Sequence, residues 1–316
     1  MSNILVTGGA GFIGSKILEA ALRKGHFCIC IDRFEDKHFP NIKRQNISYL
    51  LGHDSFSMVE GDILDLNLLK EVISENSIDY IYHQAAKVGV NFSIENPLIT
   101  HEINSKGSIN VIMASLDGGV KGIINASSSS VYGKSKYLPI DEEHPTFPIS
   151  PYGVTKLIGE HYMRVFSELY DLSTVSLRYF TVYGPGMRLD NALSIFIKNA
   201  LQNKDIEISG NGSYSRDYTY ISDIVEANLL FMNKKFSGDV FNIGRGEGIT
   251  IKELADTILE LTGSKSKIKY SKEKKGNIVH ELANTNKLEK KLNWKPKVSL
   301  EEGLKKFIEH FKKVEN

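Results

Sequence analysis

The first ordered signal in the chain is the run Ile4-Leu5-Val6-Thr7-Gly8-Gly9-Ala10-Gly11-Phe12-Ile13-Gly14. Its apolar start predicts a buried strand, and the spacing of apolar side chains over residues 15–24 predicts an amphipathic helix. The glycines between them allow a tight turn and close packing of the helix on the strand. The stretch therefore predicts a strand–turn–helix unit, which is how an α/β fold with a parallel sheet begins.

The glycine turn also has the features of a dinucleotide site. Gly8, Gly11 and Gly14 have the spacing at which backbone amides approach a pyrophosphate, and the following helix N-terminus adds partial positive charge. The next apolar run ends at Asp32, whose carboxylate suits an adenosine ribose and repels a 2′-phosphate. NAD is therefore predicted over NADP, although the adjacent Arg33 suits that phosphate. An unliganded tight turn is the alternative interpretation.

Strand and helix signals alternate over residues 1–180. Further strands are expected at residues 27–31, 58–63, 78–82 and 120–126, and helices at residues 65–76 and 97–116. The polar segment 34–53 gives no clear element. The alternation predicts a doubly wound parallel sheet, a Rossmann NAD-binding domain over residues 1–180. The looser pattern of residues 181–316 predicts a smaller C-terminal α/β lobe for the substrate, with some interleaving of the two domains.

A tyrosine and a lysine stand four residues apart where a helix is expected to begin, after Ser150. Positions i and i+4 share a helix face, so the Lys156 ammonium is expected to approach the Tyr152 phenol and lower its pKa. A phenol so perturbed acts as a base near neutral pH. A solvated surface pair is the alternative. The serine turn 127–130 ends a neighbouring predicted strand, and this position can place one of its hydroxyls beside the phenol.

Composition excludes several classes of partner. The 316 residues include 39 basic and 38 acidic side chains, a formal net charge of +1, so neither nucleic acid nor an anionic membrane is an expected partner. No run reaches the ~20 apolar residues that a membrane span needs. Cys28 and Cys30 alternate on one predicted strand, where they are poorly placed for a disulfide. We therefore expect a cytoplasmic protein, and the sequence shows no metal-ligand cluster.

Together these motifs resemble the extended short-chain dehydrogenase/reductase family, and within it the NAD-dependent nucleotide-sugar epimerases. The resemblance covers nearly the whole chain. It rests on residues 7–14, Asp32, Asp62-Ile63, His83-Gln84-Ala85-Ala86, Ser128, Val131-Tyr132-Gly133, Tyr152, Lys156, residues 178–185 and Arg216-Asp217-Tyr218.

The resemblance implies a role for each matching residue. It implies three catalytic residues, which are Ser128, Tyr152 and Lys156. It implies a cofactor site made of Gly8, Gly11, Phe12, Ile13, Asp32, Asp62, Ile63, Ala85, Ala86, Lys156 and Tyr179. It implies a substrate site made of Ser128, Ser129, Ser130, Thr181, Arg188, Arg216 and Lys274. It further implies a UDP-sugar substrate and a homodimer.

The implied reaction inverts carbon 4 of the sugar. Tyr152 removes the proton of the hydroxyl while hydride passes to NAD, and the resulting keto-sugar receives the hydride back on its other face. Ser129 and Ser130 stand where related dehydratases and decarboxylases commonly carry an acidic residue, which favours simple inversion. Residues 274–277 read Lys-Lys-Gly-Asn where the family usually has Arg-Pro-Gly-Asp, and this weakens the assignment of the base as uracil.

The identity of the sugar depends on the loop 184–193, which carries Arg188 and resembles that of UDP-glucuronate 4-epimerases. An arginine binds a carboxylate bidentately, so we predict conversion of UDP-glucuronate to UDP-galacturonate. The alternative is a UDP-glucose/UDP-galactose 4-epimerase or its N-acetylhexosamine equivalent, with Arg188 paired to Asp190 or to a phosphate. A net oxidoreductase and a non-catalytic NAD-binding sensor are further alternatives.

Overall fold

The computed structural model describes residues 1–34, 42–272 and 280–315, and these form two compact units. The first unit is Met1–Gly133 with Pro145–Tyr179 and Val225–Ile243. The second is Lys134–His144 with Phe180–Ile224 and Gly244–Asn316. Residues 225–243 lie in the first unit because their strand pairs with that unit's sheet.

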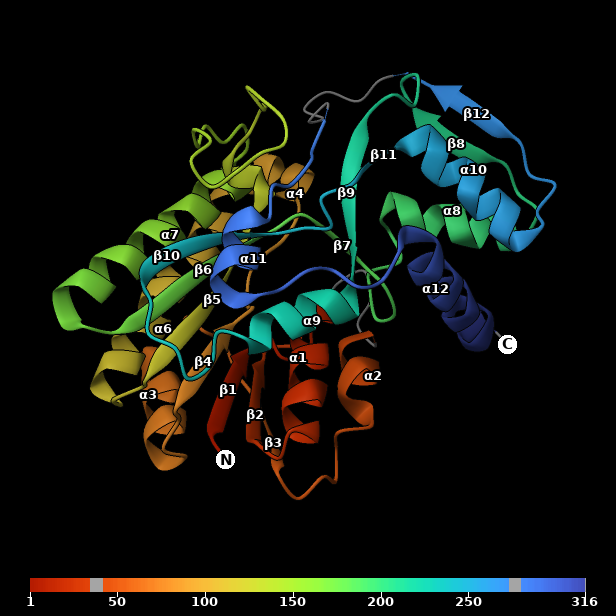
Figure 1. Cartoon of the computed structure of the whole chain (residues 1–316). Coiled ribbons are helices and arrows are strands. Elements are labelled where there is room, and N and C mark those ends of the chain that lie inside the picture. The colour runs from red at the N-terminus through yellow and green to blue at the C-terminus, as the bar shows by residue number, and fades with distance from the viewer. Residues whose placement is uncertain (35–41, 273–279, 316) are drawn as a thin grey trace. The chain divides into compact units, whose positions relative to one another are not determined.

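The first unit is built on one seven-stranded sheet (Figure 1). Its strands are β1 (Asn3–Thr7), β2 (Phe27–Asp32), β3 (Phe56–Glu60), β4 (Tyr80–His83), β5 (Gly122–Ser128), β6 (Ser173–Tyr179) and β10 (Ser237–Ile243). Their order is β10-β6-β5-β4-β1-β2-β3, and every neighbouring pair is parallel. The prediction of a doubly wound parallel sheet is therefore confirmed. Since the strands are parallel, their carboxyl ends meet at one edge, where such sheets bind ligands.

Helices cover both faces of this sheet, because side chains alternate between its faces along each strand. On β2, Ile29 and Ile31 join the core formed with α3 (Leu66–Glu75), α6 (Gly107–Asp117) and α7 (Pro151–Tyr170). Cys30 lies on the other face, beside Leu18 of α1 (Phe12–Arg23). Further members of the core are Leu5, Leu69, Val72, Ile81, Val111, Ile112, Ile123 and Met163.

Two helical segments differ from the sequence prediction. Helix α2 (Ile42–Ser48) forms in the polar segment that gave no clear element, and only its Ile47 is buried, which is too little for an apolar period to show. The single helix predicted over residues 97–116 is interrupted. Instead, α5 (Pro97–His101) passes through a π-helical turn, Glu102–Lys106, into α6. Helix α4 (Val90–Glu95) precedes α5, and a 3₁₀ turn (Ser129–Val131) follows β5.

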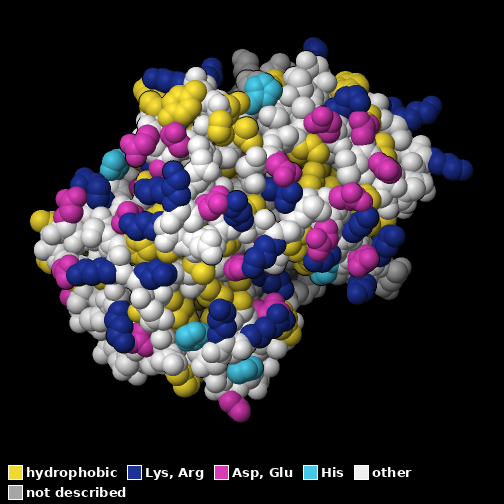
Figure 2. All heavy atoms as spheres, viewed as in Figure 1, with side chains coloured by type: hydrophobic (Ala, Val, Ile, Leu, Met, Phe, Trp, Pro, Cys, Tyr) yellow, Lys and Arg dark blue, Asp and Glu magenta, His cyan; other side chains and the backbone are white. Residues whose placement is uncertain are grey.

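The second unit carries two small sheets. One has the order β11-β9-β7 (Gly248–Thr250, Ser215–Tyr220, Thr181–Tyr183), and the other pairs β12 (Ile268–Ser271) with β8 (Ile206–Ser209). The remaining helices of the chain are α8 (Ala192–Leu201), α9 (Ile221–Leu229), α10 (Ile251–Thr262), α11 (Asn286–Leu292) and α12 (Leu300–Glu315). Figure 2 shows basic and acidic side chains interspersed over the face in view. In the described part of the chain, no helix has the length and apolar character to cross a membrane.

Candidate active site

The first unit brings Ser128, Tyr152 and Lys156 together. Ser150 caps the start of α7 by accepting a hydrogen bond from the Gly153 amide at 3.1 Å, which sets the first turn of the helix where Tyr152 lies. The Ser128 hydroxyl, at the end of β5, hydrogen-bonds the Tyr152 hydroxyl. The Lys156 Nζ lies 5.9 Å from the centre of the Tyr152 ring. Both side chains of the pair are buried, so the surface-pair alternative is wrong.

The expected lowering of the tyrosine pKa is not what the structure shows. Burial raises the pKa of Tyr152 to about 12, and the Ser128 hydrogen bond opposes this rise. Burial also lowers the pKa of Lys156 to about 8, against the charge of Glu160, which raises it. The Lys156 Nζ donates to the Ala126 carbonyl at 2.7 Å. Desolvation is the largest cause of both shifts, because it disfavours the charged form of each group. Tyr152 is therefore a neutral phenol at pH 7 unless a ligand adds positive charge.

The glycine turn packs tightly on the end of β4. A Cβ at Gly8 would lie 2.7 Å from the backbone nitrogen of Ala85, and one at Gly14 would lie 2.4 Å from the Gly8 carbonyl oxygen. The amides of Phe12 and Ile13 open α1 and so have no carbonyl partner within that helix. This backbone cradle suits the pyrophosphate of NAD, whose nicotinamide accepts and returns hydride when it is bound.

The acidic residues at the β2 and β3 ends are already paired with bases. Asp32 is buried and accepts hydrogen bonds from the Ala10 amide at 3.2 Å and from Lys43 Nζ at 2.7 Å. Arg33, the residue that favoured NADP in the sequence, donates to Asp62 at 2.8 Å. Asp32 therefore supports the glycine turn directly, and Arg33 is paired with Asp62.

Other predicted cofactor residues line the same edge. Ile63 is buried and packs against Gly107, where a Cβ would lie 2.4 Å from the Ile63 side chain. Tyr179, at the end of β6, accepts from the Gln84 side-chain amide at 3.2 Å and donates to Asn228 at 2.8 Å. Ala85 and Ala86 directly follow Gln84 and are half-buried.

His83 is an interior histidine with both ring nitrogens hydrogen-bonded. Its Nδ1 lies 2.7 Å from the Thr7 hydroxyl and its Nε2 lies 3.0 Å from the Ser108 hydroxyl. Burial lowers the pKa of His83 to about 3, so the ring is neutral. Near it, Asn104 lies in the π-helical turn and donates to the Thr155 hydroxyl on α7 at 3.0 Å. The buried Asn104 side chain thus links the π-helical turn to α7 through a hydrogen bond.

The remaining substrate-site predictions fall in two places. Ser129 and Ser130 form the 3₁₀ turn of the first unit, where the Ser130 hydroxyl accepts from Ser128 at 3.1 Å. In the second unit, Thr181 on β7 and Arg216 on β9 lie on paired strands, Thr181 opposite Tyr218.

Two arginines of the second unit are held by carboxylates. Arg216 lies 3.5 Å from the buried Glu281. Arg188 is exposed and donates to both carboxylate oxygens of Asp190, at 3.0 and 2.6 Å. This pair is the alternative that the sequence left open. Lys274 and the motif 274–277 lie outside the described residues.

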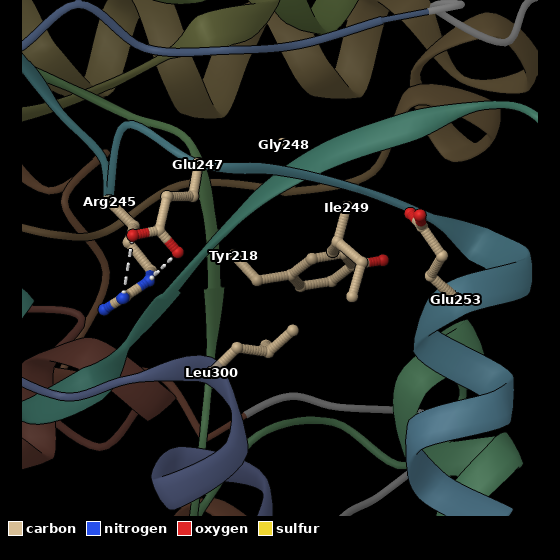
Figure 3. A pocket seen from close by; sticks show the side chains of 7 residues that line it. All are labelled: Tyr218, Arg245, Glu247, Gly248, Ile249, Glu253 and Leu300. Carbon is tan, nitrogen blue, oxygen red and sulfur yellow. Dashed lines mark hydrogen bonds and ion pairs between the residues drawn. The ribbon is translucent and has the colours of Figure 1, made fainter.

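The second unit also contains a hollow of about 280 Å³, seen in Figure 3. Its wall includes Arg245, which makes a two-point ion pair with Glu247 at 2.9 and 3.0 Å. None of the predicted substrate residues that the structure describes lines it. The lining residues are Tyr218, Arg245, Glu247, Gly248, Ile249, Glu253 and Leu300.

Two buried carboxylates, Asp217 and Glu160, were given no role by sequence reasoning, although Asp217 lies in the quoted motif Arg216-Asp217-Tyr218. Asp217 is fully buried and accepts hydrogen bonds from the amides of Arg245, Gly246 and Ala283. Burial raises its pKa to about 6, and the three amides oppose the rise. The motif does not reveal these contacts, because the partners of Asp217 are distant in sequence. Glu160 was also missed, although its spacing of four residues from Lys156 is visible in the sequence.

Comparison with known proteins agrees with this geometry. A model of the NAD dependent epimerase/dehydratase family matches residues 4–244. A UDP-glucuronate 4-epimerase of Thermodesulfobacterium geofontis is 35% identical, over 98% of this chain and 95% of its own. A UDP-glucose 4-epimerase of Thermotoga maritima, solved with UDP-glucose, superposes with a TM-score of 0.93 at 35% identity, covering 99% of this chain and 100% of its own.

A second solved structure carries the acidic sugar. The UDP-glucuronic acid 4-epimerase of Bacillus cereus, solved with UDP-glucuronic acid and NAD, has a TM-score of 0.93 at 33% identity and 99% coverage of both chains. The sequence resemblance and the cofactor prediction are thereby confirmed. The chain belongs to the NAD dependent epimerase/dehydratase family and is an NAD-dependent epimerase.

Proposed function

We propose that this protein inverts carbon 4 of UDP-glucuronate to give UDP-galacturonate. The observation that supports the 4-epimerase chemistry is the buried group of Ser128, Tyr152 and Lys156 at the carboxyl edge of the sheet. The solved relatives named above carry UDP-glucose and UDP-glucuronic acid, so a UDP-sugar is the substrate class that similarity supports.

In the proposed mechanism, the positive charges of Lys156 and of bound oxidised NAD would favour the phenolate form of Tyr152. The phenolate oxygen takes the proton from the carbon 4 hydroxyl, and Ser128 orients that hydroxyl by hydrogen bonding. NAD supplies the hydride chemistry at carbon 4, accepting a hydride and giving it back. With the hydride given back on the other face of carbon 4, return of the proton from Tyr152 to the carbon 4 oxygen would complete the inversion without net oxidation. Lys156 stabilises the phenolate as a nearby ammonium, since its pKa of about 8 leaves it mostly charged at pH 7.

Arg188 is the residue that supports glucuronate. It already binds a carboxylate with the two-point geometry that a uronate would need, although that carboxylate is Asp190. The pair is exposed, so exchanging one carboxylate for another costs little. A clamped uronate carboxylate would also be held away from the geometry that releases carbon dioxide from a 4-keto acid.

The same ion pair favours the alternative, a UDP-glucose/UDP-galactose 4-epimerase. A neutral hexose has no carboxylate to displace Asp190, so the pair as it stands in this structure suits that substrate. Similarity to the Thermotoga maritima enzyme supports it equally.

Arg188→Ala separates the two substrates. If Arg188 binds the uronate, kcat/KM for UDP-glucuronate falls about 30-fold, since a charge-assisted contact contributes ~2 kcal/mol, while kcat/KM for UDP-glucose stays within about threefold. Products are identified by NMR with wild type and variant on both substrates. The matched control is Asp190→Asn, which frees the arginine and should keep glucuronate turnover. Equal losses on the two sugars would instead assign Arg188 a structural role and favour the hexose.

The proposal includes a homodimer in the cytoplasm. Helices α4, α5 and α7 contact one another and expose apolar side chains, among them Ile94 at 55%, Leu98 at 82% and Val154 at 43%. A second copy of this chain would cover this surface. Free, buried Cys28 and Cys30 agree with a reducing compartment.

The dimer is tested by light scattering at micromolar concentration. Leu98→Glu should convert a dimer to a monomer, because it places a charge in the proposed interface. Leu51→Glu, at a side chain 55% exposed elsewhere in the first unit, should leave the mass unchanged. A wild-type mass equal to one chain would exclude the dimer.

A further inference from the structure

Three residues of α7 face β5 in succession. Tyr152, Lys156 and Glu160 are four residues apart, so they form one stripe along the helix. The end of β5 supplies a partner to each. The partners are Ser128 for Tyr152, the Ala126 carbonyl for Lys156 and the Ser127 hydroxyl for Glu160. The third residue of the stripe, Glu160, has no part in the proposed proton transfer, yet it is 4% exposed.

Glu160 is held by a two-point ion pair. Arg178 donates to its two carboxylate oxygens at 2.9 and 2.7 Å, and both side chains are buried. The third contact of Arg178 is the Tyr132 hydroxyl at 2.9 Å, and that hydroxyl donates in turn to Asn242 at 2.6 Å. Ser127, Arg178 and Asn242 lie opposite one another on β5, β6 and β10. The Glu160 carboxylate is therefore fixed across three strands.

Because Lys156 is buried, the negative charge of Glu160 affects the protonation of the lysine. The Lys156 ammonium loses hydration, and the single charge that opposes this loss in the surroundings described is Glu160. From β4, His83 is neutral, and from β6, Arg178 forms an ion pair with Glu160. Tyr152 on α7 and Tyr179 on β6 are neutral phenols. The titratable residues of the helices packed on α7 are exposed, namely Glu95, His101, Glu102, Lys106 and Asp117.

A buried ion pair is a poor way to attach a helix to a sheet. Replacing such a pair by apolar side chains of similar volume is often neutral or stabilising, because desolvation offsets the Coulomb attraction. Two apolar residues would therefore pack the helix on the sheet as well as the ion pair does. The pair here does something that apolar residues cannot, since its negative member lies on α7 one helical turn from the buried Lys156 ammonium and its positive member lies on β6.

We propose that Glu160, fixed by Arg178, is a positioning residue that keeps Lys156 in its charged form beside Tyr152. It does not touch substrate or cofactor and acts through Lys156. The inference rests on the proposed role of Lys156 in proton transfer, because that role is what gives the charge of this lysine a consequence for turnover.

The test is the pH dependence of kcat/KM in the holoenzyme. Turnover needs the ammonium, so activity falls as the pH rises through the pKa of Lys156, and removing the carboxylate that raises this pKa moves the fall to lower pH. Glu160→Gln should shift the alkaline limb down by about one pH unit. Glu160→Asp keeps the charge but shortens the reach to Arg178, so it should lower the melting temperature and leave the limb near its wild-type position.

A double variant covers the case in which Glu160→Gln does not fold. Glu160→Leu with Arg178→Met removes both charges and fills their volume, so it should fold, and its alkaline limb should lie below that of wild type by a similar amount. An unshifted limb in this double variant overturns the proposal and leaves the pair a purely structural one.

Failure of the inference is distinguishable from failure of the proposed mechanism. Lys156→Met should lose at least about 100-fold in kcat at every pH, since it removes the charge outright. If Lys156→Met stays active, the proposed role of the lysine is wrong. If it is inactive while Glu160→Gln and the double variant both titrate like wild type, only the role given to Glu160 is wrong.

Discussion

We expect Tyr152→Phe to lower kcat for epimerisation by about 10³-fold, because it removes the oxygen that we propose accepts and returns the substrate proton. The change deletes a single atom from a side chain 9% exposed, so the ring keeps its packing. Measurement of kcat on UDP-glucuronate and UDP-glucose, with the melting temperature of the same sample, checks this expectation. Cofactor binding, followed by quenching of protein fluorescence, should change less than about threefold.

Tyr170→Phe is the matched control. It makes the same chemical change on the same helix, at a tyrosine that is 58% exposed and stacks on Phe166 with ring centres 5.6 Å apart. This variant should keep wild-type kcat. If the two variants have equal activity, Tyr152 is not the base, and the assignment of Ser128 and Lys156 to its chemistry fails with it.

We expect Gly8→Ala to destabilise the first unit by at least ~3 kcal/mol and to weaken NAD binding by about 100-fold. Gly8 has a φ of +69°, and its Cβ would lie 2.7 Å from the backbone of Ala85, which cannot yield as a flexible side chain would. Relief of this contact moves the turn away from β4 and takes its amides out of reach of the pyrophosphate. The loss of one charge-assisted contact, ~2–3 kcal/mol, accounts for the expected change in affinity.

Gly25→Ala separates backbone strain from crowding. Gly25 has a φ of +78°, and a Cβ there would meet no atom within 4 Å. The control should therefore cost only ~1–2 kcal/mol and leave the dissociation constant for NAD, measured by calorimetry, unchanged. Equal effects of the two variants would show that strain alone, and not the contact with Ala85, makes a glycine necessary at position 8.

Local patterns were sufficient for the fold and for the cofactor. The run Ile4–Gly14 joins a buried strand to a helix through a turn that only glycine permits, and this unit leads to the parallel sheet that the structure contains. Local patterns did not predict α2, because a single buried isoleucine produces no apolar periodicity. They also did not predict the π turn, in which Asn104 donates to the Thr155 hydroxyl.

The same limit applies to the candidate active site, where local spacing predicted some features and missed others. Spacing was enough to place Tyr152 and Lys156 on one face of a helix, because a helix has a fixed repeat, whereas the choice of Ser128 within the serine turn came from the family resemblance. The pKa of Tyr152 was predicted in the wrong direction, since desolvation depends on everything that packs around the phenol. Similarly, the pairing of Arg188 with Asp190 was only one of several possibilities in the sequence.

The repeat of the backbone determines which residues are neighbours within one helix turn or one strand. The sequence alone therefore specifies these neighbours. Partners that come from different elements exist only once the sheet has formed. Arg178 reaches Glu160 because β6 lies beneath α7, and Asp217 receives its three amides from segments 28 and 66 residues away. Burial and charge at Lys156 arise from such partners, and therefore the state of the catalytic pair follows from tertiary packing.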